Sequence, residues 1–223
     1  MNKKEKTLQE MENKFKLSKE TRDIIHGYIM SDGYVNENGA LTVDQSLKQK
    51  KFAEWLYNKL ESIRTDSPIV EVERLHKKTN KKSYSCRFNT LSTLKGFRSM
   101  WYKLDKSTLN SCLIKKCLPL GIRGFFSPIF ITVWFAGDGT KIIGSKGGKF
   151  EVTAFSVDER LLLQRLFKEK YDIEVKINKA GFTSKGKQQW TLNVNAPEYA
   201  KFKEIITQSD LITTLFPGKI HAS

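Results

Sequence analysis

Two apolar segments of helical length stand out along the chain, and each of them ends in Asp-Gly. They cover residues 24–33 and 128–139. Elsewhere, strict alternation of apolar and polar residues predicts strands, and apolar positions three or four residues apart predict further helices. An aspartate in the last turn of a helix faces the negative end of the helix dipole, which typically costs about 0.3–1 kcal/mol. The two aspartates therefore need a reason other than helix stability.

The hydrophobic pattern predicts the same order of elements after each Asp-Gly: strand, helix, hairpin and helix. Ser18 is the predicted cap of the first apolar helix. In the first half, the elements that follow are predicted at 39–46, 51–63, 69–76 with 84–89, and 91–104. In the second half they are predicted at 148–156, 158–170 with Leu161, Leu162, Leu166 and Phe167 inward, 172–178 with 188–195, and from Pro197 onward.

This repetition predicts a divergent tandem duplication. Asp32 and Asp138 lie 106 residues apart in a chain of 223 residues, so one copy falls in each half. Halves of this kind usually pack around a pseudo-two-fold axis. The symmetry matches that of a DNA duplex backbone.

Charge narrows the class of partner. Lys and Arg number 39 against 24 Asp and Glu, a formal net charge of +15, which predicts a polyanionic ligand and nucleic acid first of all. No apolar run reaches about 18 residues and no lipidation signal is present, so no membrane partner is expected. The 3 cysteines, without a Cys-x-x-Cys pair, and the 3 histidines argue against a zinc centre.

Small residues on the two apolar helices predict that the helices pack closely together. Their positions, three and four residues apart on each helix, are Gly27, Met30 and Ser31, and Val133, Ala136 and Gly137. If the helices lie side by side with the same polarity, both aspartates reach the same edge. Two carboxylates held close together favour a divalent cation, and Asp oxygens with helix-end carbonyls suit Mg²⁺. The expected metal ligands are Asp32, Asp138 and the carbonyl oxygens of Ser31 and Gly137. Gly33 and Gly139 suit a left-handed conformation just after each helix.

The two apolar segments that end in Asp-Gly resemble the motif of a known family. The segments IHGYIMSDG (25–33) and ITVWFAGDG (131–139) are similar to the nine-residue LAGLIDADG motif of homing endonucleases, although His26 and several other positions depart from it. The resemblance extends over residues 18–219. It implies an α+β fold of two tandem αββαββα half-domains, each with a saddle-shaped antiparallel sheet, packed through the paired motif helices. The expected boundaries are an N-terminal basic extension at 1–17, half-domains at 18–119 and 128–223, and a linker at 120–127.

The resemblance also implies a function. Such proteins make a Mg²⁺-dependent double-strand break across the minor groove of a long asymmetric DNA site, and this cut promotes mobility of their host intron. Mn²⁺ is expected to substitute for Mg²⁺. With two motif copies in one chain, a monomer is expected. Many members are encoded in mitochondrial or chloroplast introns, and the charged start of this chain, without an apolar segment, is unlike a transit peptide.

Further catalytic residues are assigned by the resemblance alone. Lys116 lies 84 residues after Asp32 and Lys219 lies 81 after Asp138, and the family places lysines near these points in the active-site water network. Gln45 is similar to a polar residue that orders active-site water in relatives. Aligning the strands places Ala154 at its counterpart, which predicts two unequal catalytic sites.

Base recognition is predicted on the two hairpins, because a two-stranded ribbon fits the major groove. Lysines at the hairpin tips are expected to grip phosphates in a salt-dependent manner. Glu71 and Glu73 fit this surface less well and are expected to pair with neighbouring lysines. The predicted DNA-binding residues are Arg74, His76, Lys77, Lys78, Lys81, Lys82, Arg87, Asn89, Lys141, Lys176, Asn178, Lys185, Lys187, Gln189, Thr191 and Asn193.

Two alternatives remain open from the sequence. The chain could be an intron-RNA-binding maturase or a catalytically silent DNA-binding relative, since both preserve the fold and the charge. The segment Asp172-Ile-Glu174-Val-Lys176 also imitates the Glu-x-Lys strand of PD-(D/E)xK nucleases. That pattern arises easily by chance and is not supported by the repeat.

Overall fold

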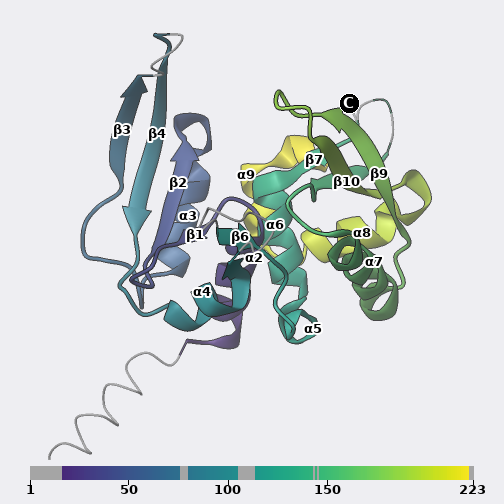
Figure 1. Ribbon diagram of the computed structural model, residues 1–223, viewed down its shortest axis with the longest axis horizontal. Helices are drawn as coiled ribbons and strands as arrows, with labels where there is room; N and C mark the ends of the chain where they lie inside the picture. The colour runs from purple at the N-terminus through teal and green to yellow at the C-terminus, as the bar shows by residue number, and fades with distance from the viewer. Residues whose placement is uncertain (1–16, 76–79, 105–113, 143, 145, 221–223) are drawn as a thin grey trace, which may run out of the picture. The chain divides into compact units, whose positions relative to one another are not determined.

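The computed structural model describes residues 17–75, 80–104, 114–142, 144 and 146–220 (Figure 1). These form two compact units. Of the described residues, the first contains those up to Arg22 together with those in Gly33–Gly96, and the second contains Asp23–Asp32 together with those from Phe97 onward. Each unit has one four-stranded antiparallel sheet, which confirms the α+β prediction. Among the described helices, none has the length and apolar character needed to cross a bilayer.

The first unit is a sheet with one helix packed on it, α3 (Lys50–Lys59), which follows the short helix η1 (Leu47–Gln49). The core between them contains Leu41 and Val43 from the sheet and Phe52 and Leu56 from α3, all fully buried. The strand order is β1-β2-β4-β3. The strands are β1 (Tyr34–Val35), β2 (Leu41–Ser46), β3 (Val70–Leu75) and β4 (Lys82–Asn89).

The strand register decides which side chains of this sheet share a face. Val43 lies opposite Phe88, and both are buried against the helix side. Because side chains alternate along a strand, the neighbouring pair Asp44 and Arg87 points to the other face. The alternation predicted for residues 84–89 is confirmed at Cys86 and Phe88, which are buried, but it is wrong at Tyr84, which is 47% exposed, and at Ser85, which is buried.

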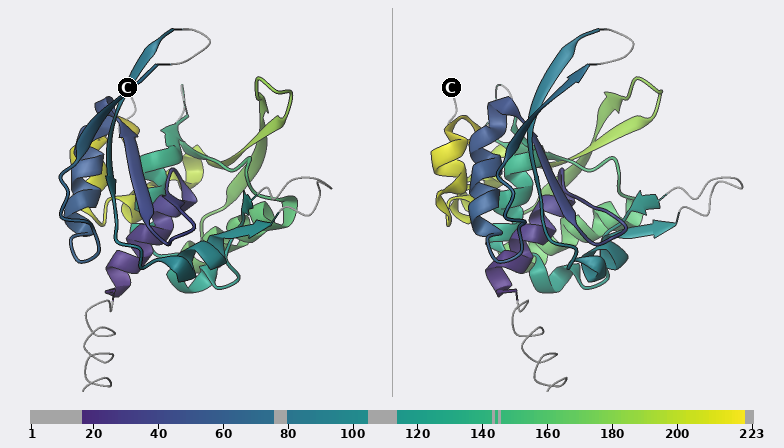
Figure 2. Two further views of the ribbon diagram at one scale, coloured as in Figure 1. Left: turned by 60° about the vertical axis from the view of Figure 1, so that its left-hand side comes forward. Right: turned by 90° about the vertical axis from the view of Figure 1, so that its left-hand side faces the viewer.

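The second unit repeats the topology, with strand order β7-β8-β10-β9. Figure 2 shows its long hairpin, β9 and β10, in green. The strands are β7 (Gly139–Lys141), β8 (Gly148–Glu151), β9 (Val175–Phe182) and β10 (Gln188–Val194). Two helices cross the boundary between the units: α2 (Lys19–Met30) belongs to the second unit from Asp23 onward, and α4 (Lys95–Trp101) from Phe97 onward. The other helices of the second unit are α5 (Ile122–Phe125), α6 (Pro128–Asp138), α7 (Val157–Tyr171), η2 (Ala196–Glu198), α8 (Tyr199–Ile206), α9 (Asp210–Leu215) and η3 (Pro217–Lys219).

Helix ends in this unit follow from local sequence. Ser127 caps α6 by accepting a hydrogen bond from the backbone N–H of Phe130, and Pro128 occupies the first turn. The start of α7 is a capping box, in which Ser156 and Glu159 each accept from the other's backbone N–H. The helix buries Leu163, whereas the expected inward residue Leu161 is 43% exposed, so the inward face was predicted wrongly at this point.

The predicted helix at 91–104 is wrong at both ends. It begins only at Lys95 and ends at Trp101, after which Tyr102–Leu104 forms strand β5. This strand pairs with β6 (Ile114–Lys116), and the register places Tyr102 opposite Lys116. The partner strand is distant in sequence, so periodicity within the segment could not show the pairing. The consequence is a fixed position for Lys116.

His26 explains one departure from the family motif. Its ring is buried and stacks on Phe125, with the ring centroids 3.6 Å apart. The indole Nε1 of Trp101 donates a hydrogen bond of 2.8 Å to its Nδ1 atom. The histidine is thus a packed and hydrogen-bonded member of the core around α2.

Candidate active site

Helices α2 and α6 approach each other so closely that glycine is required at two contact points. A Cβ atom on Gly27 would lie 2.6 Å from the carbonyl oxygen of Phe130 and 3.1 Å from the Cβ of Val133. A Cβ atom on Gly137 would lie 2.5 Å from the hydroxyl of Ser31. The prediction of close packing through small residues is confirmed.

This packing brings the two aspartates together at the ends of the helices. A Cβ atom on Gly137 would lie 3.1 Å from the Oδ2 atom of Asp32, so the Asp32 carboxylate lies against the residue that precedes Asp138. Burial, and after it the charge of Asp32, raises the pKa of Asp138 to about 7. The two acidic side chains, one from each half of the sequence, therefore share one partly buried site.

Each motif helix ends on a lysine from the end of its own half. The Nζ atom of Lys116 donates to the carbonyl oxygens of Ile29, at 2.6 Å, and Ser31, at 2.9 Å. The Nζ atom of Lys219 donates in the same way to Phe135, at 2.8 Å, and Ala136, at 2.7 Å. A cation at a helix C-terminus satisfies its free carbonyls and offsets the negative end of the dipole.

The two lysines belong electrostatically to the same site. Burial lowers the pKa of Lys116, and lowers the pKa of Lys219 to about 8, against the charges of Asp138 and Asp32, which act in the opposite direction. A lysine with a pKa near 8 exchanges its proton near physiological pH. The four predicted catalytic residues Asp32, Asp138, Lys116 and Lys219 are thus brought together by the fold.

The glycines after the aspartates act differently from expectation. Gly139 has φ −73° and ψ 140°, an extended conformation open to any residue, and Gly33 is likewise not among the described glycines with positive φ. A left-handed turn was therefore predicted wrongly. Glycine is needed at 139 for space, because a Cβ atom there would lie 2.1 Å from the ring of Phe135.

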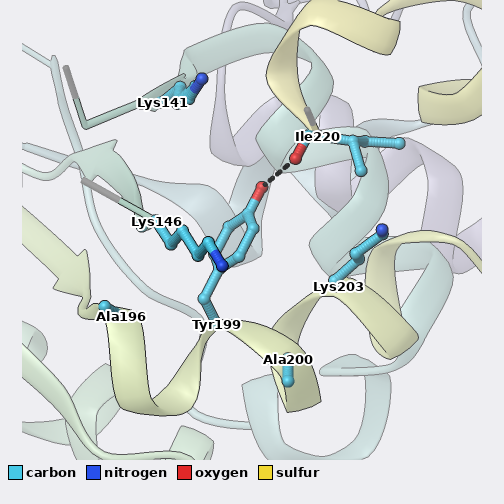
Figure 3. Close-up of a pocket in the computed structure, with 8 residues that line it drawn as sticks. Lys141, Lys146, Ala196, Tyr199, Ala200, Lys203 and Ile220 are labelled. Carbon is cyan, nitrogen blue, oxygen red and sulfur yellow. Dashed lines mark hydrogen bonds between the residues drawn. The ribbon is translucent and has the colours of Figure 1, made fainter. Parts of the chain in front are cut away.

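Tyr199 is a contributor that the sequence did not reveal. Its hydroxyl donates to the carbonyl oxygen of Ile220, at 3.1 Å (Figure 3). It also donates to the carbonyl oxygen of Lys219, at 3.0 Å. The tyrosine thereby fixes the backbone that carries the Lys219 side chain. The sequence predicted only that it belongs to the helix after Pro197, because the carbonyls that it holds are about 20 residues away.

A basic cavity of about 450 Å³ lies beside Tyr199 (Figure 3). Lys141 belongs to its lining, and the register puts this lysine on the sheet face opposite that of Thr140 and Lys149. Its predicted contact with DNA would therefore differ from that of the base-reading residues. The full lining is Lys141, Lys146, Gly147, Ala196, Tyr199, Ala200, Lys203 and Ile220.

The donor set fits a hard divalent cation. Within the described part of the chain, no group of three or more His, Cys, Asp or Glu is arranged to hold a metal ion. Mg²⁺ commonly uses one or two carboxylates and completes its shell with water and phosphate oxygens. Asp32, Asp138 and the Gly137 carbonyl match this pattern. The raised pKa of Asp138 indicates that a positive charge at this position would stabilise its ionised carboxylate. The Ser31 carbonyl fits less well, because it already accepts from Lys116.

Gln45 lies on β2 in the first unit, where it is 3% exposed and shares the helix-facing side with Val43. Its predicted role in ordering active-site water stays a prediction. Ala154, the expected counterpart, lies in a turn after β8 and not in a strand.

The second sheet presents a polar face built around its central strand β10. Asn193 lies between Lys149 and Lys176, and its Oδ1 atom is buried with no hydrogen-bond partner. Thr191 lies between Glu151 and Asn178 on the same face. The register irregularity between Gln188 and Trp190 places Gln189 at a bulge, so its direction could not follow from alternation.

The first sheet presents Arg74, Arg87 and Asn89 on its uncovered face, and their contact with DNA stays a prediction. Glu71 and Glu73 point to the opposite face, where they pair with Lys50 and Lys82, each at 2.9 Å. This confirms their pairing with lysines and explains why they fitted the DNA surface poorly. Lys81, Lys185 and Lys187 are exposed at the hairpin ends. The predicted residues His76, Lys77 and Lys78 lie outside the described residues.

The segment that imitates a PD-(D/E)xK strand has a different structure. Asp172 ends α7 in a left-handed conformation, with φ 51°, and pairs with Lys168 and Lys201, each at 2.7 Å. Glu174 also pairs with Lys168, and strand β9 begins only at Val175. The three residues therefore do not share one strand, and this alternative loses its geometric basis.

Comparisons with known proteins agree with this geometry. A family model described as the LAGLIDADG DNA endonuclease family matches residues 22–202. No curated protein sequence matches the chain.

Solved structures share the fold at low sequence identity. The homing endonuclease I-WcaI bound to its DNA recognition sequence is 16% identical, with a TM-score of 0.71 over 90% of this chain and 87% of that one. A mesophilic variant of the homing endonuclease I-DmoI is 15% identical, with a TM-score of 0.51 over 86% and 98%. Full-length DUF199/WhiA from Thermatoga maritima is 12% identical, with a TM-score of 0.53 over 94% and 63%.

Proposed function

Because this chain belongs to the LAGLIDADG DNA endonuclease family, we propose that it is a site-specific endonuclease that makes a divalent-metal-dependent double-strand break in DNA. Its substrate is a long asymmetric duplex site in its host gene, and the break promotes mobility of the host intron. The protein acts as a monomer, since one chain supplies both motif copies. The proposed setting is a mitochondrial or chloroplast genome.

The observation that carries this proposal is the meeting of Asp32 and Asp138 where α2 and α6 touch. A silent DNA-binding protein gains nothing from two carboxylates whose burial and mutual repulsion raise the pKa of Asp138 to about 7. A nuclease does gain, because this arrangement concentrates oxygen ligands at a point where phosphate must also bind. A bound divalent cation lowers the pKa of the attacking water and neutralises charge on the phosphate.

The protein groups divide the remaining work. Asp32, Asp138 and the Gly137 carbonyl would hold the cation. Lys116 and Lys219 place positive charge beside the carboxylates, where they can stabilise the extra negative charge that develops on the phosphate during cleavage. The pKa of Lys219, about 8, also suits exchange of a proton with ordered water.

Asymmetry of the target follows from the two sheets. One face presents two arginines and Asn89, whereas the other presents lysines, Asn193 and Thr191. Arginine favours guanine and asparagine favours adenine in the major groove, so the two halves of the site should differ in sequence. The net charge of +15 supports the non-specific part of the affinity.

The test is cleavage selection with the purified full chain. A host-derived or randomised DNA library is incubated with Mg²⁺ or with EDTA, and cut fragments are sequenced. We expect one dominant site, cut on both strands only with Mg²⁺. Asp32→Asn and Asp138→Asn should retain binding and lose cutting by roughly 10²-fold or more. Asp66→Asn, at an exposed position of the first unit, is the matched control and should cut normally.

Two results would contradict the proposed endonuclease activity. A protein that binds intron RNA tightly, and cuts no DNA with Mg²⁺ or Mn²⁺, is a maturase and overturns the proposal. Specific DNA binding without any cutting identifies a silent relative.

A further inference from the structure

Asp44 links two arginines across three neighbouring strands of the first sheet. The Oδ2 atom of Asp44 accepts from Nη2 of Arg87 at 2.6 Å and from its Nε at 3.2 Å. The same oxygen accepts from Nη2 of Arg74. Asp44 lies on β2, Arg87 on β4 and Arg74 on β3, in the order of the sheet.

The carboxylate in this group is shielded and the two guanidinium groups are open to solvent. The side chain of Asp44 is 22% exposed, against 38% for Arg87 and 46% for Arg74. Partial burial raises the pKa of Asp44, but hydrogen bonds from Arg87 and Arg74 outweigh it, so the pKa lies below its usual value. Asp44 is thus ionised at neutral pH, and the group keeps a net positive charge.

Any stabilisation of the fold by this group leaves its arrangement toward solvent to be explained. A single ion pair with an exposed partner usually contributes little, and a bidentate pair or a network contributes somewhat more, because ordering the long side chains offsets part of the attraction. What Asp44 does provide is orientation. A guanidinium has five N–H donors, and Asp44 takes two from Arg87, so further donors of each arginine remain to be directed elsewhere.

The direction follows from the strand register. Asp44 and Arg87 are direct cross-strand neighbours on the face that α3 leaves uncovered. One pair further along the same face, Thr42 donates to the Oδ1 atom of Asn89 at 2.9 Å. A sheet face of this kind fits the major groove, where an oriented arginine binds O6 and N7 of guanine with two hydrogen bonds.

The described part of the second sheet has no equivalent group. At the central strand of that sheet, the residue facing Glu151 is Thr191, and Asn193 faces Lys149. The arginine pair is therefore a feature of one half only, and duplication of the fold does not explain it.

We propose that Asp44 is a specificity-determining residue, which holds Arg87 and Arg74 in place to read guanine in one half of the DNA target. This inference rests on the proposed function and deepens it. Asp44 acts through the arginines, so it is a positioning residue for base recognition and has no part in the cleavage chemistry.

The test compares base preferences in a binding selection on randomised half-site DNA. Asp44→Asn is nearly isosteric but removes the charge that orders the arginines. We expect the full chain carrying this change to lose roughly tenfold of its preference for guanine at one position, or at two adjacent positions, with other positions unchanged. Arg87→Lys removes the planar guanidinium that donates two hydrogen bonds to guanine, so it should weaken the preference for guanine at the same position.

Glu73→Gln is the matched control. It removes one negative charge from the same sheet, but from the opposite face, where Glu73 pairs with Lys82. Both charge-removing variants should bind DNA somewhat more tightly at low salt, and only Asp44→Asn should change the base preference. Thermal melting of each variant checks that the fold is retained.

The outcomes separate this inference from the proposed function. If the unaltered protein selects no DNA sequence, the proposed function fails. If it selects a site and Asp44→Asn keeps every base preference within about twofold, well short of the value of a bidentate contact, only the role of Asp44 is overturned. An effect of Asp44→Asn at a base that neither Arg87→Lys nor Arg74→Lys affects would also overturn it, because Asp44 would then contact that base itself.

Discussion

The Nζ atom of Lys219 donates a hydrogen bond of 2.8 Å to the carbonyl oxygen of Phe135, which lies 84 residues earlier in the chain. Phe135 is three residues before Asp138, and Ile29, which accepts from Lys116, is three residues before Asp32. Both halves therefore close their motif helix with a lysine at the same place. The lysines stabilise the helix ends and supply positive charge next to the carboxylates.

Replacing either lysine with methionine should separate cutting from binding. Lys116→Met and Lys219→Met remove a charge that lies beside the proposed cleavage site but not on the base-reading faces. We expect the single-turnover cleavage rate to fall roughly 10²-fold while the dissociation constant for target DNA changes little. The measurement is cleavage under saturating enzyme alongside a filter or fluorescence binding assay.

Lys187→Met is the control for these variants, since Lys187 is exposed on a hairpin tip. It should weaken binding in a salt-dependent manner and leave the saturated rate unchanged. Equal losses of binding and rate in all three variants would show that the buried lysines act only as general positive charge.

The pKa of Asp138 predicts how stability depends on pH in the absence of metal. Its folded value is about 7 against 3.8 for the ordinary carboxyl, so between these values the folded state binds more protons than the unfolded state. Stability must then fall as pH rises from about 4 to about 7. Asp138→Asn removes this cost, and we expect it to stabilise the protein by about 1–4 kcal/mol at pH 7.5 in EDTA.

Thermal melting at pH 5 and pH 7.5 measures this effect. Asp66→Asn is again the control, because its carboxyl is exposed. Adding Mg²⁺ should raise the melting temperature of the unaltered protein and leave Asp138→Asn nearly unchanged. A melting temperature of Asp138→Asn that follows the same pH dependence as the unaltered protein would contradict the assignment.

Gly27→Ala should be strongly destabilising. The added Cβ atom would lie 2.6 Å from the backbone oxygen of Phe130, which cannot move without separating α2 from α6. We expect a loss of about 2 kcal/mol or more in the free energy of unfolding, measured by urea titration. Any remaining folded protein should also cut poorly, because the aspartates move with these helices.

Gly96→Ala provides the matched comparison. Gly96 is also in a helix, but a Cβ atom there meets nothing within 4 Å. This change should be neutral, or stabilising by up to about 1 kcal/mol, through helix propensity. Similar effects of the two substitutions would mean that the helices are less tightly packed than described.

Tyr199→Phe should slow cleavage without changing affinity for DNA. The variant keeps the ring but loses the hydroxyl that holds the carbonyl groups of Lys219 and Ile220. We expect a destabilisation of about 1 kcal/mol and a several-fold lower cleavage rate, because Lys219 is less well fixed. Tyr57→Phe, which loses a hydrogen bond to the carbonyl of Ser67 and another from Arg64 in the first unit, should cost at least as much stability and leave the rate unchanged. Equal cleavage rates for the two variants would show that the Tyr199 hydroxyl has no specific effect on cleavage.

The sequence alone determined the repeated order of elements, because the spacing of apolar residues within a segment is enough to indicate whether that segment is a helix or a strand. It also pointed to Asp32 and Asp138, since an anion at an adverse helix end, found twice at half-chain spacing, is unusual. Small residues at Gly27 and Gly137 predicted the close helix contact that the structure contains. The family resemblance added Lys116 and Lys219, which no local pattern would have selected in a chain so rich in lysine.

Only the tertiary structure decided which residues meet. Strand β5 exists because a partner from beyond residue 113 pairs with it, so the predicted helix at 91–104 had to be shortened. The register of three strands places Asp44 between Arg74 and Arg87, and the path of the chain after α9 brings the Lys219 backbone to Tyr199. These contacts depend on how distant segments pack, and hydrophobic periodicity records only which face of a segment is buried, not what lies against it.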